Sequence, residues 1–286
     1  MKHDVDGLIQ MAFVTRNART IAAKVYHEGN SRVSSNIPLP NEATPYYFFI
    51  STGGGFIEGE KYEVAVTVEK QAQAIVTTQA PTYVYKCDNG AETTQTVTLD
   101  LEAESTLEYL TDEVIPYKNS IYKQETIVNM EESSTLVVMD GVTAGWSEDE
   151  KAFQYQKVQM KTTVFMDERL VYNDHLICEP QENEMTALGY FEGYSNYNSL
   201  LVLSPKCTKQ VIETIKNRLE SLDATIAVGL STLEKPGFVI RTLGENGEKN
   251  RHVLMAALNW FRMEALDKHE LVLSKNDHYF QSEAFN

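Results

Sequence analysis

The side chains in this sequence best suited to chemistry are carboxylates that lie on or beside predicted strands. They are Glu58, Glu60, Glu108, Glu113, Asp140, Glu148 and Glu150. Scattered oxygen ligands in a wet cavity would let a divalent cation pass, whereas closely spaced nitrogen or sulfur ligands would hold it. Taken one at a time, however, each carboxylate is better explained as a solvated surface group. The pattern allows a transient cation path and provides no fixed metal site.

Glu108 differs from the other carboxylates because it alternates with Leu107 and Tyr109 in an apolar strand. Alternation places it on one face of the strand, so it either faces solvent or points into a polar interior. If it is buried, it must have a partner, because an unpaired buried charge is costly.

Other kinds of chemistry have weaker support. The six histidines show no paired spacing typical of a metal site. No Gly-x-Ser-x-Gly motif provides a nucleophile. The glycine-rich stretch 53–60 follows a strand but leads to neither a helix nor a P-loop lysine, which favours a turn. At Gly54 and Gly55 we expect positive φ or a close approach of the backbone to another group.

A hydrolase is the alternative from a different functional class. A carbohydrate-active β-rich enzyme could use Glu108 together with Glu113 or Asp112 as its carboxylate pair. In a chain with a formal net charge of -16, however, adjacent carboxylates also arise by chance.

The net charge of -16 restricts the possible partners. An acidic surface repels nucleic-acid phosphates and anionic membranes, so neither is expected as a partner. The three cysteines are far apart and odd in number, which is typical of a reducing compartment. The N-terminus lacks a signal-peptide pattern, and no apolar run reaches the ~20 residues of a membrane span. We expect a cytoplasmic protein.

A faint repeat predicts the architecture that must position these groups. Apolar residues alternate over 62–68, 97–101 and 126–130, and each segment is followed by a polar turn and a second strand. The spacing from Val68 to Leu101 to Met130 is 33 and then 29 residues. This recurrence predicts a mainly β fold with a twisted, helically wound or stacked sheet. A hairpin turn is expected at 166–169.

The pattern changes near Ser204-Pro205, where helical periodicity begins. We predict a helix over 211–222, strands over 225–230 and 238–242, and a second helix over 253–266. The expected domains are a β-rich body over 1–203, a helix-strand-strand-helix unit over 204–268 packed on it, and a frayed tail over 269–286.

An ordered set of motifs within residues 50 to 175 carries a resemblance to a known family. The motifs are 53–60 (Gly-Gly-Gly-Phe-Ile-Glu-Gly-Glu), 77–80 (Thr-Thr-Gln-Ala), 84–86 (Val-Tyr-Lys) and 107–110 (Leu-Glu-Tyr-Leu), followed by Glu113, Ile115 and Tyr117. Together they resemble the urease accessory protein D family (UreD), which is called H (UreH) in some organisms. The sequence departs from the family at Tyr83, Asp112 and Val142, where lysine, glutamine and arginine are expected, so the resemblance assigns no charge-specific role to these three positions.

The resemblance implies a maturation factor that is not an enzyme. Members bind apo-urease together with accessory proteins F and G and help deliver nickel from the GTPase G to the urease active site. It also implies a mostly β fold with two helices, no tightly bound cofactor, and a water-filled passage that carries nickel in transit. Together with the carboxylate pattern, it makes these residues candidates for lining the passage or binding partners: Glu60, Thr78, Gln79, Tyr85, Glu108, Glu113, Asp140 and Glu150.

Overall fold

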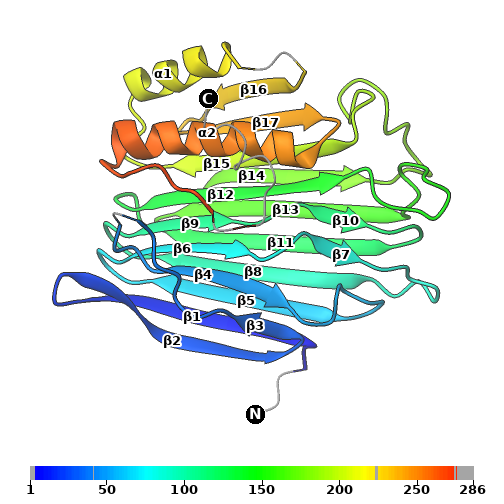
Figure 1. Ribbon diagram of the computed structural model, residues 1–286, viewed down its shortest axis with the longest axis horizontal. Helices are drawn as coiled ribbons and strands as arrows, with labels where there is room; N and C mark the ends of the chain where they lie inside the picture. Colours follow the sequence, from blue (N-terminus) through cyan, green and yellow to red (C-terminus); the bar gives the residue numbers. More distant parts are fainter. Residues whose placement is uncertain (1–3, 41, 223–224, 274, 276–286) are drawn as a thin grey trace.

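The chain winds between two β-sheets that pack against each other (Figure 1). The computed structural model describes residues 4–40, 42–222, 225–273 and 275. The seven-stranded sheet has the order β14 (Arg169–Cys178), β13 (Lys157–Met166), β11 (Ile121–Met130), β8 (Thr93–Leu101), β5 (Lys61–Val68), β1 (Gly7–Arg16), β2 (Arg19–Gly29). The ten-stranded sheet has the order β16 (Ala227–Thr232), β17 (Gly237–Gly244), β15 (Asn196–Leu203), β12 (Thr135–Thr143), β9 (Thr106–Leu110), β6 (Gln73–Thr78), β4 (Tyr46–Ser51), β3 (Ser31–Val33), with β10 (Val114–Pro116) and β7 (Thr82–Val84) paired beside it.

Successive strands alternate between the two sheets, so the central part of the chain forms a coil. Strands β5, β8, β11 and β13 pair in parallel in one sheet, and β4, β6, β9 and β12 do so in the other. The mainly β, helically wound fold expected from the repeat is therefore confirmed. Parallel neighbours in one sheet cannot be joined by a tight hairpin and need a crossover connection. The second strand of each repeat provides that crossover, and it lies in the opposite sheet.

Equivalent turns stack on one another at the repeat spacing. In each turn a backbone N–H donates to the carbonyl three residues earlier: Ala72 to Glu69, Ser105 to Glu102 and Ser134 to Glu131. This repeated turn is the physical basis of the repeat in the sequence. The expected hairpin at 166–169 is also present, where β13 meets β14 in an antiparallel pair and Asp167 and Glu168 take positive φ.

The main apolar core lies between the two sheets. Across the seven-stranded sheet, strand register aligns a row of inward-facing side chains, Phe13, Val68, Leu101, Met130 and Met166, all of them buried. Each fully buried side chain of this size contributes about 1.5–3 kcal/mol through the hydrophobic effect. The period-2 alternation in the sequence therefore places these apolar side chains on the core-facing side of their strands.

Two helices cover the outer face of the ten-stranded sheet (Figure 1). Helix α1 (Lys209–Leu219) begins after Thr208, whose hydroxyl accepts from the Val211 N–H at 3.2 Å, and so starts a few residues after Ser204-Pro205. Helix α2 (Gly247–Ala265) begins after Asn246, which caps Lys249 N–H at 3.1 Å. No helix in the described ranges is both long and apolar enough to cross a membrane.

The C-terminal helices and strands are joined to the β body by hydrogen bonds and by packing. Strands β16 and β17 extend the ten-stranded sheet through β15. The first five residues of the tail, 269–273, are not frayed, because Leu271 and Leu273 are buried in the apolar cluster beneath the helices. The rest of the tail, apart from residue 275, lies outside the described residues.

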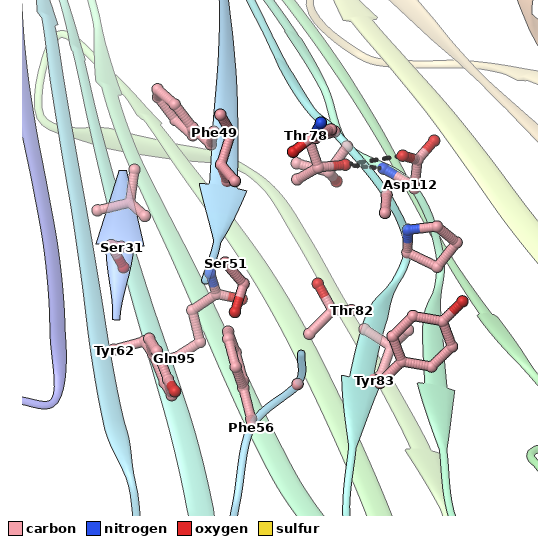
Figure 2. Close-up of a pocket in the computed structure, with 18 of the residues that line it drawn as sticks. Ser31, Phe49, Ser51, Phe56, Tyr62, Thr78, Thr82, Tyr83, Gln95 and Asp112 are labelled. Atoms are coloured by element: carbon pink, nitrogen blue, oxygen red, sulfur yellow. Dashed lines mark hydrogen bonds between the residues drawn. The ribbon is translucent and has the colours of Figure 1, made fainter. Parts of the chain in front are cut away.

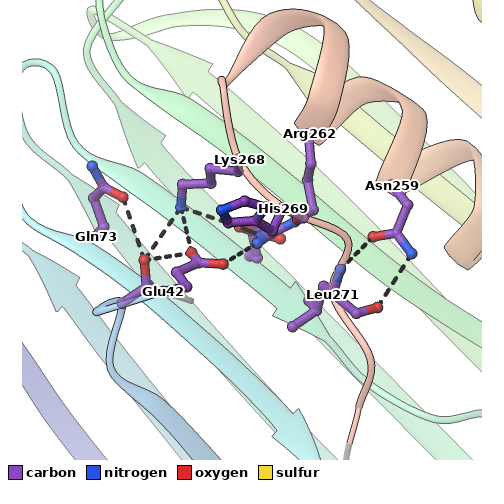
Figure 3. Close-up of polar contacts among 9 residues, drawn as sticks. Glu42, Gln73, Asn259, Arg262, Lys268, His269 and Leu271 are labelled. Carbon is purple, nitrogen blue, oxygen red and sulfur yellow. Dashed lines mark hydrogen bonds and ion pairs between the residues drawn. The ribbon is translucent and has the colours of Figure 1, made fainter. Parts of the chain in front are cut away.

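A buried cluster of charges fastens α2 to the sheet (Figure 3). The guanidinium of Arg262 is 0% exposed and donates to Glu108 on β9, to Glu42, and to the His269 carbonyl. Lys268 adds a second positive charge, 3.1 Å from Glu42 and 3.6 Å from Glu108. Burial alone would raise the pKa of Glu42, but Lys268, Thr44 and Arg262 lower it below its ordinary value. The partner that a buried Glu108 requires is therefore present.

Removal of one carboxylate from this cluster should destabilise the fold strongly. For Glu108→Ala we expect the free energy of unfolding in urea to fall by about 3–5 kcal/mol, because Arg262 keeps a buried charge that has lost a partner. A matched control is Glu264→Ala, whose carboxylate pairs with Arg218 at 2.7 Å on the surface and should contribute less than about 1 kcal/mol. If the free energy of unfolding falls by a similar amount in the two variants, the buried cluster does not stabilise the fold more than a surface ion pair does.

Candidate functional site

A cavity of about 180 Å³ opens between the two sheets near the glycine-rich turn (Figure 2). Exposed Ser51, Gly54 and Gln79 mark its mouth, and Tyr109 and Gln124 line its inner part. Loops and strand ends form the mouth, whereas facing strands form the walls. The predicted candidates Thr78, Gln79, Gly54 and Gly55 are thus brought together in one place.

A row of polar side chains crosses the ten-stranded sheet on the face toward the seven-stranded sheet. Asp140 on β12 lies opposite Ser199 on β15, which in turn lies opposite Arg241 on β17. Thr78 on β6 and Thr111, just after β9, extend the same row and line the cavity. Of these five residues, the sequence predicted only Thr78 and Asp140. The other three become recognisable only through the register between strands, which aligns them on one face of the sheet.

The facing part of the seven-stranded sheet is also polar. The Tyr122 hydroxyl donates to Gln95 Oε1 at 2.8 Å and lies 3.1 Å from Gln124 Oε1. The Gln124 amide in turn donates to Thr126 at 3.5 Å. Oxygen atoms therefore line part of both walls of the space between the sheets at this end, beside the side chains of a second apolar cluster that includes Phe56, Tyr62 and Val114.

Asp140 is the carboxylate in the centre of the polar row. It is half-buried between the sheets, and burial raises its pKa to about 7; Asp174 adds to the rise and Arg241 opposes it. Arg241 itself pairs with Asp174 of β14 at 3.1 Å, which joins the two sheets at this side. At neutral pH, Asp140 is therefore poised between its neutral and its charged form.

Asp112 sits at the rim of the cavity and links it to helix α2. It accepts from the Thr78 hydroxyl at 3.0 Å, and its backbone N–H donates to the same hydroxyl at 2.9 Å (Figure 2). It also pairs with Arg251 of α2 at 2.8 Å and with Lys275 at 2.7 Å. The family resemblance gave no reason to expect a charge-specific role at Asp112. In the structure, however, two positively charged side chains pair with this carboxylate.

The glycine-rich turn is shaped by a close approach to two tyrosines. Gly54 has φ +75°, and its carbonyl accepts from the Tyr85 hydroxyl at 3.1 Å. A Cβ on Gly55 would lie 2.7 Å from Tyr85 Cε2 and 2.9 Å from the Tyr83 carbonyl. The geometry leaves little room for a side chain at Gly55, and it places Tyr85 against the turn at the mouth of the cavity.

The remaining candidates lie apart from the polar row. Glu60 is engaged in the glycine turn, where it accepts from the Ile57 N–H at 2.9 Å and from the Tyr62 hydroxyl at 2.5 Å. Glu150 is exposed in the loop before β13. Glu113 is buried against Gly247 at the start of α2, and burial raises its pKa.

Glu108 points to the opposite face of β9 from the polar row, toward α2. Because it is 0% exposed and paired with Arg262, it does not offer a carboxylate to a bulky substrate. Asp112 is likewise paired with the side chains of Arg251 and Lys275. This geometry does not suit the carboxylate pair of a glycoside hydrolase, whose members must reach the scissile bond. Across the described residues, no three His, Cys, Asp or Glu side chains gather into a group that could hold a metal ion.

The turn at the mouth of the cavity can be tested by adding one methyl group. We expect Gly55→Ala to lower the free energy of unfolding by about 1–3 kcal/mol, because the new Cβ collides with the Tyr83 backbone and the Tyr85 ring. Gly53→Ala is the control, since a Cβ there has 3.5 Å to its nearest neighbour. If thermal melting is equally affected in both variants, the close approach at Gly55 has no special importance.

The raised pKa of Asp140 predicts a pH-dependent effect of Asp140→Asn. An acid with a higher pKa in the folded state stabilises fully below its ordinary pKa, and this contribution is lost as pH rises through about 7. Relative to wild type, the asparagine variant should therefore gain stability between about pH 5 and about pH 7.5, as measured by urea denaturation. Wild type measured over the same pH range is the reference for this difference. If the free energies of unfolding of Asp140→Asn and wild type differ by the same amount at every pH, the raised pKa of Asp140 is contradicted.

Comparison with known proteins covers nearly the whole chain. The sequence profile of a family described as "UreD urease accessory protein" matches residues 5–275, well beyond the 50–175 region that carried the resemblance. The chain is 46% identical over 277 residues to urease accessory protein UreD of Streptococcus salivarius (strain 57.I), covering 97% of this chain and 99% of that protein. It is 32% identical over 269 residues to the protein of the same name from Bacillus sp. (strain TB-90), covering 94% and 98%. The chain therefore belongs to the UreD urease accessory protein family.

Proposed function

We propose that this chain is a urease maturation factor that binds apo-urease together with accessory proteins F and G and helps deliver nickel to the urease active site. Family membership supports the role in urease maturation. The observation that carries the nickel part is the row of polar side chains between the sheets, because it runs from Thr78 and Thr111 in the wall of the cavity to the carboxylate of Asp140.

The chemistry of this row suits a cargo in transit. Hydroxyl and amide oxygens of Thr78, Thr111 and Gln124 can replace part of a cation's hydration shell without binding it tightly. Asp140 supplies the charge that draws the cation inward, and it is the carboxylate of the row itself. Because neutral oxygens are spread along the row and only one carboxylate adds a charge, the cation can exchange from ligand to ligand.

Arg241 bounds the path on its far side. Its positive charge, paired with Asp174 at 3.1 Å, opposes further movement of a cation across the sheet. Protonation of Asp140 would also weaken its hold on the cation, and its pKa of about 7 makes this change accessible near neutral pH. Protonation of Asp140 would therefore favour release of the cargo.

The proposal is tested by urease activation in cells that lack the gene. We expect urease to be synthesised but nickel-poor and inactive when nickel is limiting, and the wild-type gene should restore activity. Asp140→Asn should still assemble with accessory proteins F and G and apo-urease, yet require more nickel for half-maximal activation, because the amide keeps the shape and loses the charge.

Two comparisons make this test decisive. Glu213→Gln removes an exposed charge from α1 and should give the wild-type nickel dependence at equal levels of complex. Fully active urease in the deletion strain at limiting nickel would refute the maturation role. Activation by Asp140→Asn that is identical to wild type would refute the path while leaving the maturation role intact.

A further inference from the structure

Four aromatic rings gather on the outward face of the paired strands β7 and β10. Tyr83 lies in β7, Tyr85 follows that strand, and Tyr117 follows β10. Trp146 lies beside Tyr117 across an isolated parallel bridge. The ring centroids of Tyr85 and Tyr117 are 5.0 Å apart, and those of Tyr117 and Trp146 are 4.7 Å apart. Tyr83 joins them at 6.1 Å from Tyr117. We call these four residues the aromatic platform.

Strand register places the rings of the aromatic platform on one face. β7 and β10 pair in parallel with Ile115 beside Tyr83, so the residues two positions further along also lie side by side. The intervening Val84 and Pro116 are buried, which turns the tyrosines outward. Trp146 at the end of the platform is 50% exposed. Contiguous, partly exposed aromatic rings are typical of a binding surface.

The platform offers side-chain donors but no free backbone edge. Within the described part of the chain, the hydroxyls of Tyr83 and Tyr117 and the indole N–H of Trp146 donate to no other group. The backbone beneath the rings is already paired. The Tyr117 N–H donates to the Val84 carbonyl at 2.8 Å, and the Trp146 N–H donates to the Pro116 carbonyl at 3.0 Å. An added β-strand would therefore find no partner groups here, and an α-helix would bring no free carbonyls to these donors.

A proline-rich segment in the polyproline II conformation matches both features. Its carbonyls make no internal hydrogen bonds, so they can accept from phenol and indole donors, and its proline rings pack on aromatic faces. One turn of this conformation has three residues and rises about 9.3 Å. The two successive separations of 5.0 and 4.7 Å, from Tyr85 through Tyr117 to Trp146, carry the platform across about one such turn.

Acidic side chains next to the platform add a preference for charge. Glu148 and Glu150 are exposed in the loop that follows Trp146. Asp149 between them pairs with Lys151 at 3.2 Å, whereas no ion pair holds either glutamate within the described residues. A lysine or arginine beside the prolines would be attracted to these two carboxylates. A second copy of this chain, with its net charge of -16, would be repelled.

We infer that the aromatic platform binds an extended, proline-rich segment of a partner protein that carries a lysine or arginine beside its prolines. The segment would lie at the mouth of the cavity, because Tyr83 lines the cavity and Tyr85 donates to the Gly54 carbonyl of the glycine-rich turn. A polyproline II segment is already extended before it binds, so little ordering opposes the association. The inference goes beyond the proposed function and does not rest on it.

The experiment titrates the purified full-length chain, by calorimetry, with an acetylated peptide that contains two Pro-x-x-Pro repeats and one arginine. We expect saturable binding of this peptide and none of a glycine-serine peptide of equal length and charge. Tyr117→Ala and Trp146→Ala should each weaken binding about tenfold or more, because each removes a ring from the platform. The matched control is Tyr26→Ala, since Tyr26 is 39% exposed on β2 and lies outside the platform. If Tyr117→Ala fails to fold, the exposed Trp146 position decides the test.

A charge variant tests the preference for a basic residue. Glu148→Gln should weaken binding of the arginine peptide about two- to fivefold at low salt, whereas Glu213→Gln on α1 should not. An unchanged affinity of Glu148→Gln would overturn the charge preference.

Three results would overturn the binding site itself. They are no saturable binding by the wild-type chain at millimolar peptide, equal binding of the proline-rich and glycine-serine peptides, and wild-type affinity in Trp146→Ala. The assay contains neither urease nor nickel, so any of these results would leave the proposed function standing. Conversely, fully active urease in the deletion strain would refute the maturation role without affecting the peptide site.

Discussion

The guanidinium of Arg262 carries a positive charge to a place that solvent does not reach, and the arrangement of the C-terminal third depends on how that charge is balanced. Its partners come from distant parts of the chain, 154 residues away at Glu108 and 220 residues away at Glu42. A buried charge tolerates only well-matched partners. The cluster therefore fixes the position of α2 on the sheet more specifically than apolar contacts alone, which can slide.

Fixing α2 has a consequence for the opposite face of the same sheet. On β9, Glu108 points to the helix while Tyr109, one residue later, points to the space between the sheets. Arg251 of α2 reaches Asp112, which holds Thr78 at the rim of the cavity. One helix thus braces both the outer face of the sheet and the residues that shape the cavity, so the site depends on packing that lies outside it.

The sequence predicted the wound sheet, both helices and the need of Glu108 for a partner, because periodicity and burial report local geometry. It did not reveal the polar row, since Thr111, Ser199 and Arg241 are unremarkable in their own strands and become a row only through register between distant strands. It also grouped Glu108 and Asp140 as candidates for lining one passage or binding partners, although the two face opposite sides of the sheet. The packed segment 269–273 was missed because Leu271 and Leu273 stand among charged residues.

The separation of Arg262 from its partners also bears on the order in which the protein is made. Synthesis from the N-terminus delivers Glu42 and Glu108 long before Arg262 leaves the ribosome. Until then the helix-facing surface of the sheet has carboxylates without their counter-charge and apolar side chains without their cover. A prematurely terminated chain would expose both, which are features that chaperones and proteases recognise. The C-terminal part of the chain is therefore needed to neutralise and cover a surface that the earlier part forms.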